Sequence, residues 1–283
     1  MSYRSIAVHL DAGPRCAART MLALQIAHRW EARLLGVAAT GIADARLAMS
    51  LDTPGAIEFV PLSPEVLQQR AEGLVTAFAA RCSVDRVARV EGRIVVSEAV
   101  DAVVGQARWC DLVVIGQAEP GVQIESVAAD LPQQTIVHSA CPVLVVPYAG
   151  TFEAGIGQRI LVAWKDSQEC ARALHDALPF LKRAARTTIL EIGDAEPAAD
   201  APSPTAARDA TRAWLAAHGI AVEWRTDVAP VAVGERILSV AADVAADLIV
   251  AGAYGHTRVR ERLFGGVTRH LLEHMTAPTL FGH

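Results

Sequence analysis

Residues 247–268 read DLIVAGAYGHTRVRERLFGGVT. The apolar run 248–251 ends at Gly252, and a second glycine follows at Gly255. Nine further residues lead to a glycine pair at 265–266, where a helical pattern begins. The stretch therefore predicts a buried strand, a glycine loop and a helix N-terminus. Such a terminus offers unpaired N–H groups and the positive end of a helix dipole to an anion.

This stretch has a counterpart in the first half of the chain. The segment DLVVIG at 111–116 matches DLIVAG at 247–252 with an offset of 136 residues, and the same offset carries His138 onto His274. Nearer the starts of the halves, Cys16-Ala17 matches Cys170-Ala171. Self-similarity of this kind indicates a duplicated βα unit. The first half is the longer one, and we assign its extra residues to a surface insertion at 41–61.

Apolar runs and helical spacings alternate along both halves, which predicts two open parallel sheets with helices on both faces. A glycine-containing segment without apolar periodicity, 148–157, is the predicted linker between domains at 1–148 and 158–283. The predicted strands are 3–10, 33–40, 84–90, 111–115 and 142–146, then 159–164, 187–192, 220–227, 248–251 and 279–281. The predicted helices are 16–30, 64–81, 98–108 and 131–139, then 169–181, 205–218, 234–245 and 266–274.

Composition narrows the classes of function. Hydrophobic residues make up 52% of the 283 residues, which is enough for a substantial core, and the net charge of −5 argues against nucleic acid or an anionic membrane as the main partner. The start of the chain shows no secretion signal and no apolar run is long enough to span a membrane, so we expect a cytoplasmic protein. The five scattered cysteines are expected to be reduced thiols.

Each half resembles a universal stress protein domain, and the whole chain resembles a tandem universal stress protein. That family carries the phosphate-loop motif G-x2-G-x9-G-[ST]. Gly252, Gly255 and Gly265 match it, Gly266 stands at the Ser/Thr position, and Val267-Thr268 continues the match. The resemblance implies a five-stranded parallel sheet of order 3-2-1-4-5, with ATP, accompanied by Mg²⁺, in the crevice where strands 1 and 4 diverge.

The two halves depart from the family pattern in different ways. In the second half Lys165, after Ala163-Trp164, replaces the family's Asp, and a lysine accepts no hydrogen bonds. The resemblance then implies base contacts through the backbone near Ala163 and Ile192. In the first half Asp11 holds the Asp position, but Glu119 and Ala129-Asp130 replace the loop glycines. We therefore predict no triphosphate binding in the first half.

Other motifs are weighed and set aside. His270-Leu-Leu-Glu-His274 fits the H-x-x-E-H pattern of inverted zinc peptidases, but only nine residues follow it, so we predict no metal site. His9 lies in the first strand and is predicted to be a core histidine. Asp111 and Asp247 precede equivalent strands and are predicted to cap turns. The alternating arginines 258, 260 and 262 are interpreted as a solvated loop face.

The sequence thus predicts a nucleotide-binding stress regulator with no catalytic residues. The predicted partners are the nucleotide and the other half of the chain, which would pack as a pseudo-dimer through the edge near the fifth strand of each domain. Further homodimerisation stays open. Two alternatives also stay open: a nucleotide-free interaction scaffold, and a slow ATPase.

Overall fold

The computed structural model describes residues 2–41, 63–83, 89–120, 130–193, 204–228, 232–254 and 266–283. The fold is α/β, and the chain divides into compact units at residues 3–140 and 141–283. None of the helices in these ranges combines the length and hydrophobicity that a membrane crossing requires. The insertion predicted at 41–61 lies, from residue 42 on, outside the described residues.

Helices and strands alternate through the first half, as predicted from the apolar periodicity. Ser63 shows how local chemistry sets a boundary, because its hydroxyl accepts a hydrogen bond from the Val66 amide and Pro64 takes the first helical position. The strands are β1 (Ser5–Leu10), β2 (Arg33–Ala39), β3 (Val90–Val95), β4 (Leu112–Gly116) and β5 (Val143–Val146). The helices are α1 (Cys16–Trp30), α3 (Pro64–Cys82), α4 (Ala99–Ala107) and α5 (Leu131–His138).

The second half repeats the same order of elements. Ser167 caps its first helix by accepting a hydrogen bond from the Cys170 amide at 3.3 Å. The strands are β6 (Arg159–Trp164), β7 (Arg186–Gly193), β8 (Glu223–Val228), β9 (Leu248–Gly252) and β10 (Thr279–Gly282). The helices are α6 (Gln168–Leu181), α7 (Pro204–Ala217), α8 (Val233–Asp243) and α9 (Gly266–His274).

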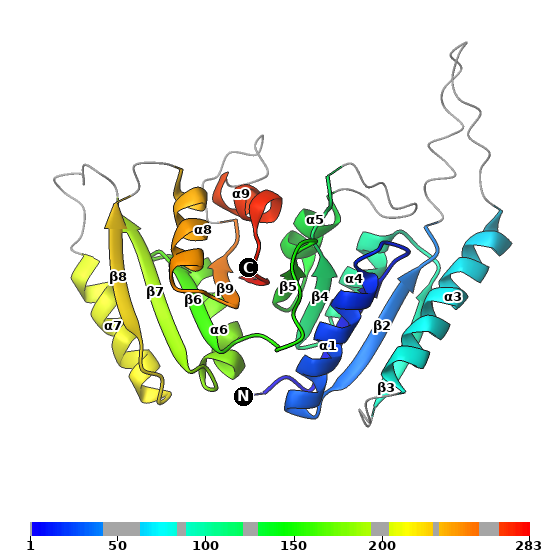
Figure 1. The fold of residues 1–283 in the computed structure, drawn as a ribbon, viewed down its shortest axis with the longest axis horizontal. Helices are drawn as coiled ribbons and strands as arrows, with labels where there is room; N and C mark the ends of the chain where they lie inside the picture. The colour runs from blue at the N-terminus through cyan, green and yellow to red at the C-terminus, as the bar shows by residue number, and fades with distance from the viewer. Residues whose placement is uncertain are drawn as a thin grey trace, which may run out of the picture. The chain divides into compact units, whose positions relative to one another are not determined.

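The strand order is β3-β2-β1-β4-β5 in the first half and β8-β7-β6-β9-β10 in the second, which confirms the predicted order 3-2-1-4-5. Within the unit 141–283, β5 pairs antiparallel with β10, and all other pairings of that unit's described strands are parallel. In the second half α6 packs on β9 and β10, while α8 and α9 lie side by side (Figure 1). The direction of the crossovers reverses between β6 and β9, which is where ligands bind in open α/β sheets.

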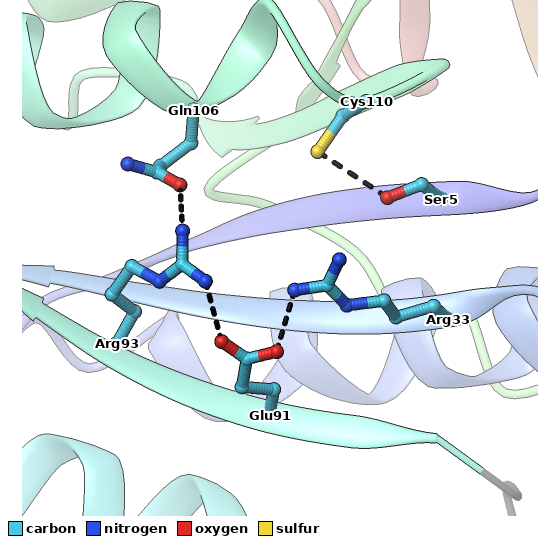
Figure 2. Close-up of polar contacts among 6 residues, drawn as sticks. All are labelled: Ser5, Arg33, Glu91, Arg93, Gln106 and Cys110. Carbon is cyan, nitrogen blue, oxygen red and sulfur yellow. Dashed lines mark hydrogen bonds and ion pairs between the residues drawn. The ribbon is translucent and has the colours of Figure 1, made fainter.

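One strand was predicted in the wrong place. The prediction was 84–90, but the strand runs from Val90 to Val95, and residues 84–88 lie outside the described part of the chain. β3 is a terminal strand of the sheet and is half exposed, so it contains charged residues. The prediction relied on an apolar run, which this strand does not have. Figure 2 shows the result: the Glu91 carboxylate accepts hydrogen bonds from Arg33 of β2 and from Arg93.

The equivalent aspartates Asp111 and Asp247 have the same structural role. Asp111 accepts hydrogen bonds from the backbone amides of Arg4 and Ser5 at 2.7 and 2.9 Å, just where β1 begins. Asp247 accepts from the amides of 157–159 ahead of β6, at distances between 2.7 and 3.2 Å. Each carboxylate therefore fixes the start of the central strand of its half, as the repeat predicted.

We expect Asp247→Ala to lower the free energy of unfolding of the second half by about 1.5–3 kcal/mol, because it removes charge-assisted hydrogen bonds to backbone amides. Urea unfolding followed by circular dichroism measures the change. The matched variant Asp111→Ala should destabilise the first half by a similar amount. A loss below about 0.5 kcal/mol in both, which is the size of an ordinary surface substitution, would contradict an anchoring role.

Candidate functional site

The candidate site of the second half lies where β6 and β9 end. These two strands are parallel neighbours, with Ala163 opposite Ala251, so Trp164, Lys165 and Gly252 follow at the same edge of the sheet. Because β9 and β10 are also parallel, α9 runs back along the sheet and its N-terminus stands at this edge. The structure thus brings together the ends of the strands and the helix terminus that the sequence predicted to meet.

Gly252 is required by packing. A Cβ atom built on it would stand 2.6 Å from the backbone nitrogen of Cys170 and 2.7 Å from the carbonyl carbon of Glu169. The first turn of α6 therefore lies directly against the end of β9. A side chain at this position would displace α6, so the glycine alone is not evidence for a phosphate.

The N-terminus of α9 is open to ligand. Apart from its chain neighbours and the backbone of its own helix, no atom of the described residues lies within 4 Å of the point where a Cβ of Gly266 would stand, so packing there does not demand a glycine. Gly266 and Val267 are exposed, whereas Thr268 is only 4% exposed. The first turn of α9 thus has two exposed residues, but the buried Thr268 is a poor substitute for the hydroxyl that Gly266 lacks.

Gly255, Gly265 and the arginines 258, 260 and 262 lie outside the described residues. The segment entering the loop is described, and there Tyr254 takes a left-handed backbone conformation with φ of 57°. Its ring packs edge-on against His283, and burial raises the pKa of its hydroxyl to about 12.

Ile192, the remaining predicted contact, lies near the end of β7 and is partly exposed. It pairs with Asp227 of β8, whereas the residue that pairs with Trp164 is Glu191. Since side chains alternate along a strand, Ile192 and Trp164 face opposite sides of the sheet. The predicted residues at 163–165 and 192 therefore do not all contribute to one face.

Sequence reasoning missed an aromatic cluster on the α6/α7 side of this sheet. Trp164 packs edge-on against Trp224 with ring centroids 5.0 Å apart, and Trp224 donates a hydrogen bond to Glu191. On α7, Trp214 contacts both His175 and His218, with centroids 4.4 and 4.7 Å apart. Three of the chain's five tryptophans thus gather around α7. The only available signal was this enrichment in a chain with 5% aromatic residues.

A pocket of about 230 Å³ opens beside this cluster, between α6 and α7. Leu174 and Trp164 supply apolar surface, and Trp214 and His175 supply ring surface. Lys165 also lines the pocket, together with the neighbouring Asp166 and Ser167.

The equivalent crevice of the first half is closed by an arginine. Arg19, on α1, donates to the Asp11 carboxylate at 2.7 Å and to the carbonyl oxygen of His9 at 2.9 Å. Its guanidinium also lies against Gly116, where it would clash with a Cβ. Burial by itself would raise the pKa of Asp11, but Arg19, His9 and the Gly13 amide outweigh it and lower that pKa. Asp11 stands where the family has an Asp that contacts the nucleotide, but here its carboxylate is paired with Arg19.

His9 is buried beside this ion pair. Its Nδ1 atom is 3.5 Å from Asp11 and has no hydrogen-bond partner among the described residues. Burial lowers the pKa of His9 to about 4, against a smaller upward effect from Asp11. A neutral, inaccessible imidazole agrees with the prediction of a core histidine.

The H-x-x-E-H residues lie on α9, with the rings of His270 and His274 side by side at 4.6 Å. Glu273 is engaged by Arg269 at 2.7 Å. Within the described ranges, no group of three or more candidate ligands surrounds a common point.

Comparisons with known proteins agree with this architecture. Residues 157–281 match the family model described as "Universal stress protein family". A universal stress protein structure from Archaeoglobus fulgidus DSM 4304 is 13% identical, covers 98% of this chain and 95% of that chain, and has a TM-score of 0.72. A functionally unknown protein from Pseudomonas aeruginosa PAO1 is 15% identical, with 99% and 92% covered and a TM-score of 0.63. The TM-scores and the coverage show a shared fold. Among curated proteins, none matches the sequence.

Proposed function

We propose that the chain acts as a tandem universal stress protein, since residues 157–281 match that family and the two halves share one strand order, and that its second domain binds an adenine nucleotide such as ATP. The protein is then a cytoplasmic regulator: nucleotide in the second domain biases its conformation or its choice of partner. The first domain serves as a nucleotide-free companion, and no catalysis is required.

The observation that carries the proposal is the open N-terminus of α9 at the edge where β6 and β9 end. Gly266 and Val267 are exposed there, and the dipole of the helix favours a negative group. Lys165 follows β6 at the same edge and is exposed. Lys165 stands where the family has an Asp. Its ammonium group carries a positive charge, which would attract the phosphates of the nucleotide.

The direct test is to denature the purified protein and analyse the supernatant for adenine nucleotides. Thermal unfolding with and without millimolar ATP and Mg²⁺ complements it. We expect either a co-purified nucleotide or an upward shift of Tm with ATP. If neither is found, the protein is better explained as a nucleotide-free scaffold. Two observations are compatible with that role: Gly252 is required by packing, and Arg19 fills the crevice of the first half.

Two substitutions at Gly266 test the phosphate site from opposite directions. We expect Gly266→Ser to raise ATP affinity about tenfold, because it adds a hydroxyl donor worth roughly 1.5 kcal/mol to a charged acceptor. Gly266→Glu should abolish binding by charge repulsion, yet keep the fold, since a carboxylate suits a helix N-terminus. Titration calorimetry with ATP measures both. Equal affinities for wild type, Gly266→Ser and Gly266→Glu would place the phosphates elsewhere.

A further inference from the structure

The aromatic pocket between α6 and α7 lies beside the end of β6, and of its lining residues only Lys165 also belongs to the phosphate site proposed above. Trp164 and Leu174 supply apolar surface, while Trp214 and His175 present rings tilted by 53° at a centroid distance of 4.4 Å. Binding pockets combine such apolar and aromatic surface with a few polar groups that orient the ligand. Here the polar groups are those of Lys165, Asp166 and Ser167.

We propose that this pocket is the base subsite of the nucleotide, an inference that rests on the function proposed above. The base stacks on Trp214 beside His175, and the phosphates extend past Lys165 to the N-terminus of α9. Nucleobases stack on aromatic side chains whatever their sequence identity, so this subsite favours purines over smaller rings without reading their edges closely.

The geometry of α6 connects the two subsites. Ser167, which lines the pocket, accepts a hydrogen bond from the Cys170 amide at 3.3 Å. Gly252 packs against that same amide nitrogen from the direction of β9. A single turn of α6 therefore separates the pocket from the end of β9.

The same geometry explains how base recognition can change when Lys165 replaces the family's Asp. Trp164 is fixed by Trp224, whose indole donates to Glu191, and Glu191 is held by Arg208 at 2.7 Å. This network supports the pocket from the sheet side. The base is then recognised by stacking in a supported aromatic pocket, whose lining also includes the carboxylate of Asp166.

The test compares ATP with inorganic tripolyphosphate, which has the phosphates but no base. We expect Trp214→Ala to weaken ATP binding about tenfold and to leave tripolyphosphate binding unchanged, whereas Gly266→Glu weakens both. Trp214→Phe, which keeps a ring, should retain most of the ATP affinity. Trp109→Ala is the matched control, because Trp109 is 79% exposed in the other half of the chain.

A second variant guards against a folding defect in Trp214→Ala. Ala210 is exposed on α7 and lines the pocket, so Ala210→Trp fills the space without removing a contact. It should weaken ATP binding and spare tripolyphosphate. If both pocket variants bind ATP as wild type does while Gly266→Glu does not, the base lies elsewhere and this inference is overturned, with the proposed function intact. If wild type binds neither ligand, the proposed function itself fails.

Discussion

Replacing Arg19 with alanine is expected to lower the free energy of unfolding of the first half by about 3–5 kcal/mol. The side chains of Arg19 and Asp11 are only 4% and 6% exposed, and their ion pair is 2.7 Å long. Removing the guanidinium leaves a buried carboxylate without its main partner and removes the donor to the His9 carbonyl. Urea unfolding monitored by circular dichroism measures the loss.

The chain offers a matched control for this prediction. Arg33 also pairs with a carboxylate in the first half, but Arg33 and Glu91 are 38% and 44% exposed. Exposed pairs contribute about 0–1 kcal/mol, so Arg33→Ala should cost little. The double variant Asp11→Leu/Arg19→Met should recover most of the stability lost in Arg19→Ala, because it leaves no buried charge at this pair. Equal losses for Arg19→Ala and Arg33→Ala would show that the buried pair has no structural role.

The Arg19 pair also shows why part of the candidate site was beyond prediction from sequence. Asp11 was identified from the family pattern, but an arginine within a helical pattern is ordinarily a solvated residue. Its burial depends on Gly116, which is almost a hundred residues away and leaves room for the guanidinium. The prediction that the first half binds no triphosphate was based on the lost glycines, and the structure adds a separate reason, a crevice already occupied.

The helices and apolar strands could be predicted because their signals are local. Ser63-Pro64 marks the start of α3, and the apolar runs at 159–164 and 248–251 mark β6 and β9. The terminal strand β3 could not be predicted from an apolar run, because its charged residues are solvated or paired across strands. The pocket is a harder case: Trp164 and Trp214 are fifty residues apart, and only the packing of α7 beside α6 brings them to one surface.

Two separate reasons can explain the glycine at position 252. The glycine matches the family's phosphate loop, yet its neighbours are backbone atoms of α6. Gly252→Val would therefore unfold or shift α6 whether or not nucleotide binds. Gly266 separates the two causes, since no described atom outside its own helix and its chain neighbours stands where its Cβ would lie.

Acidification is expected to destabilise the first half between pH 6.5 and about 4, through His9. Burial lowers the pKa of His9 to about 4 in the folded protein, whereas the unfolded chain keeps the ordinary value of 6.5. Over that interval the unfolded chain binds a proton that the folded protein excludes, so stability falls as the pH falls. The difference corresponds to a loss of about 3 kcal/mol relative to neutral pH, complete near pH 4.

His9→Leu isolates this effect, because the variant cannot titrate and the Nδ1 atom it removes has no hydrogen-bond partner in the described part of the chain. We expect the variant to match wild type at pH 7 within about 1.5 kcal/mol and to surpass it near pH 4.5. His138→Gln, which removes an exposed histidine of the same half, is the matched control. The pKa of Asp11 is lowered below 3.8, so protonation of that carboxyl destabilises the fold only at still lower pH. Urea unfolding at pH 7, 6, 5 and 4.5 separates the variants, and an unaltered pH slope in His9→Leu would assign the acid sensitivity to another group.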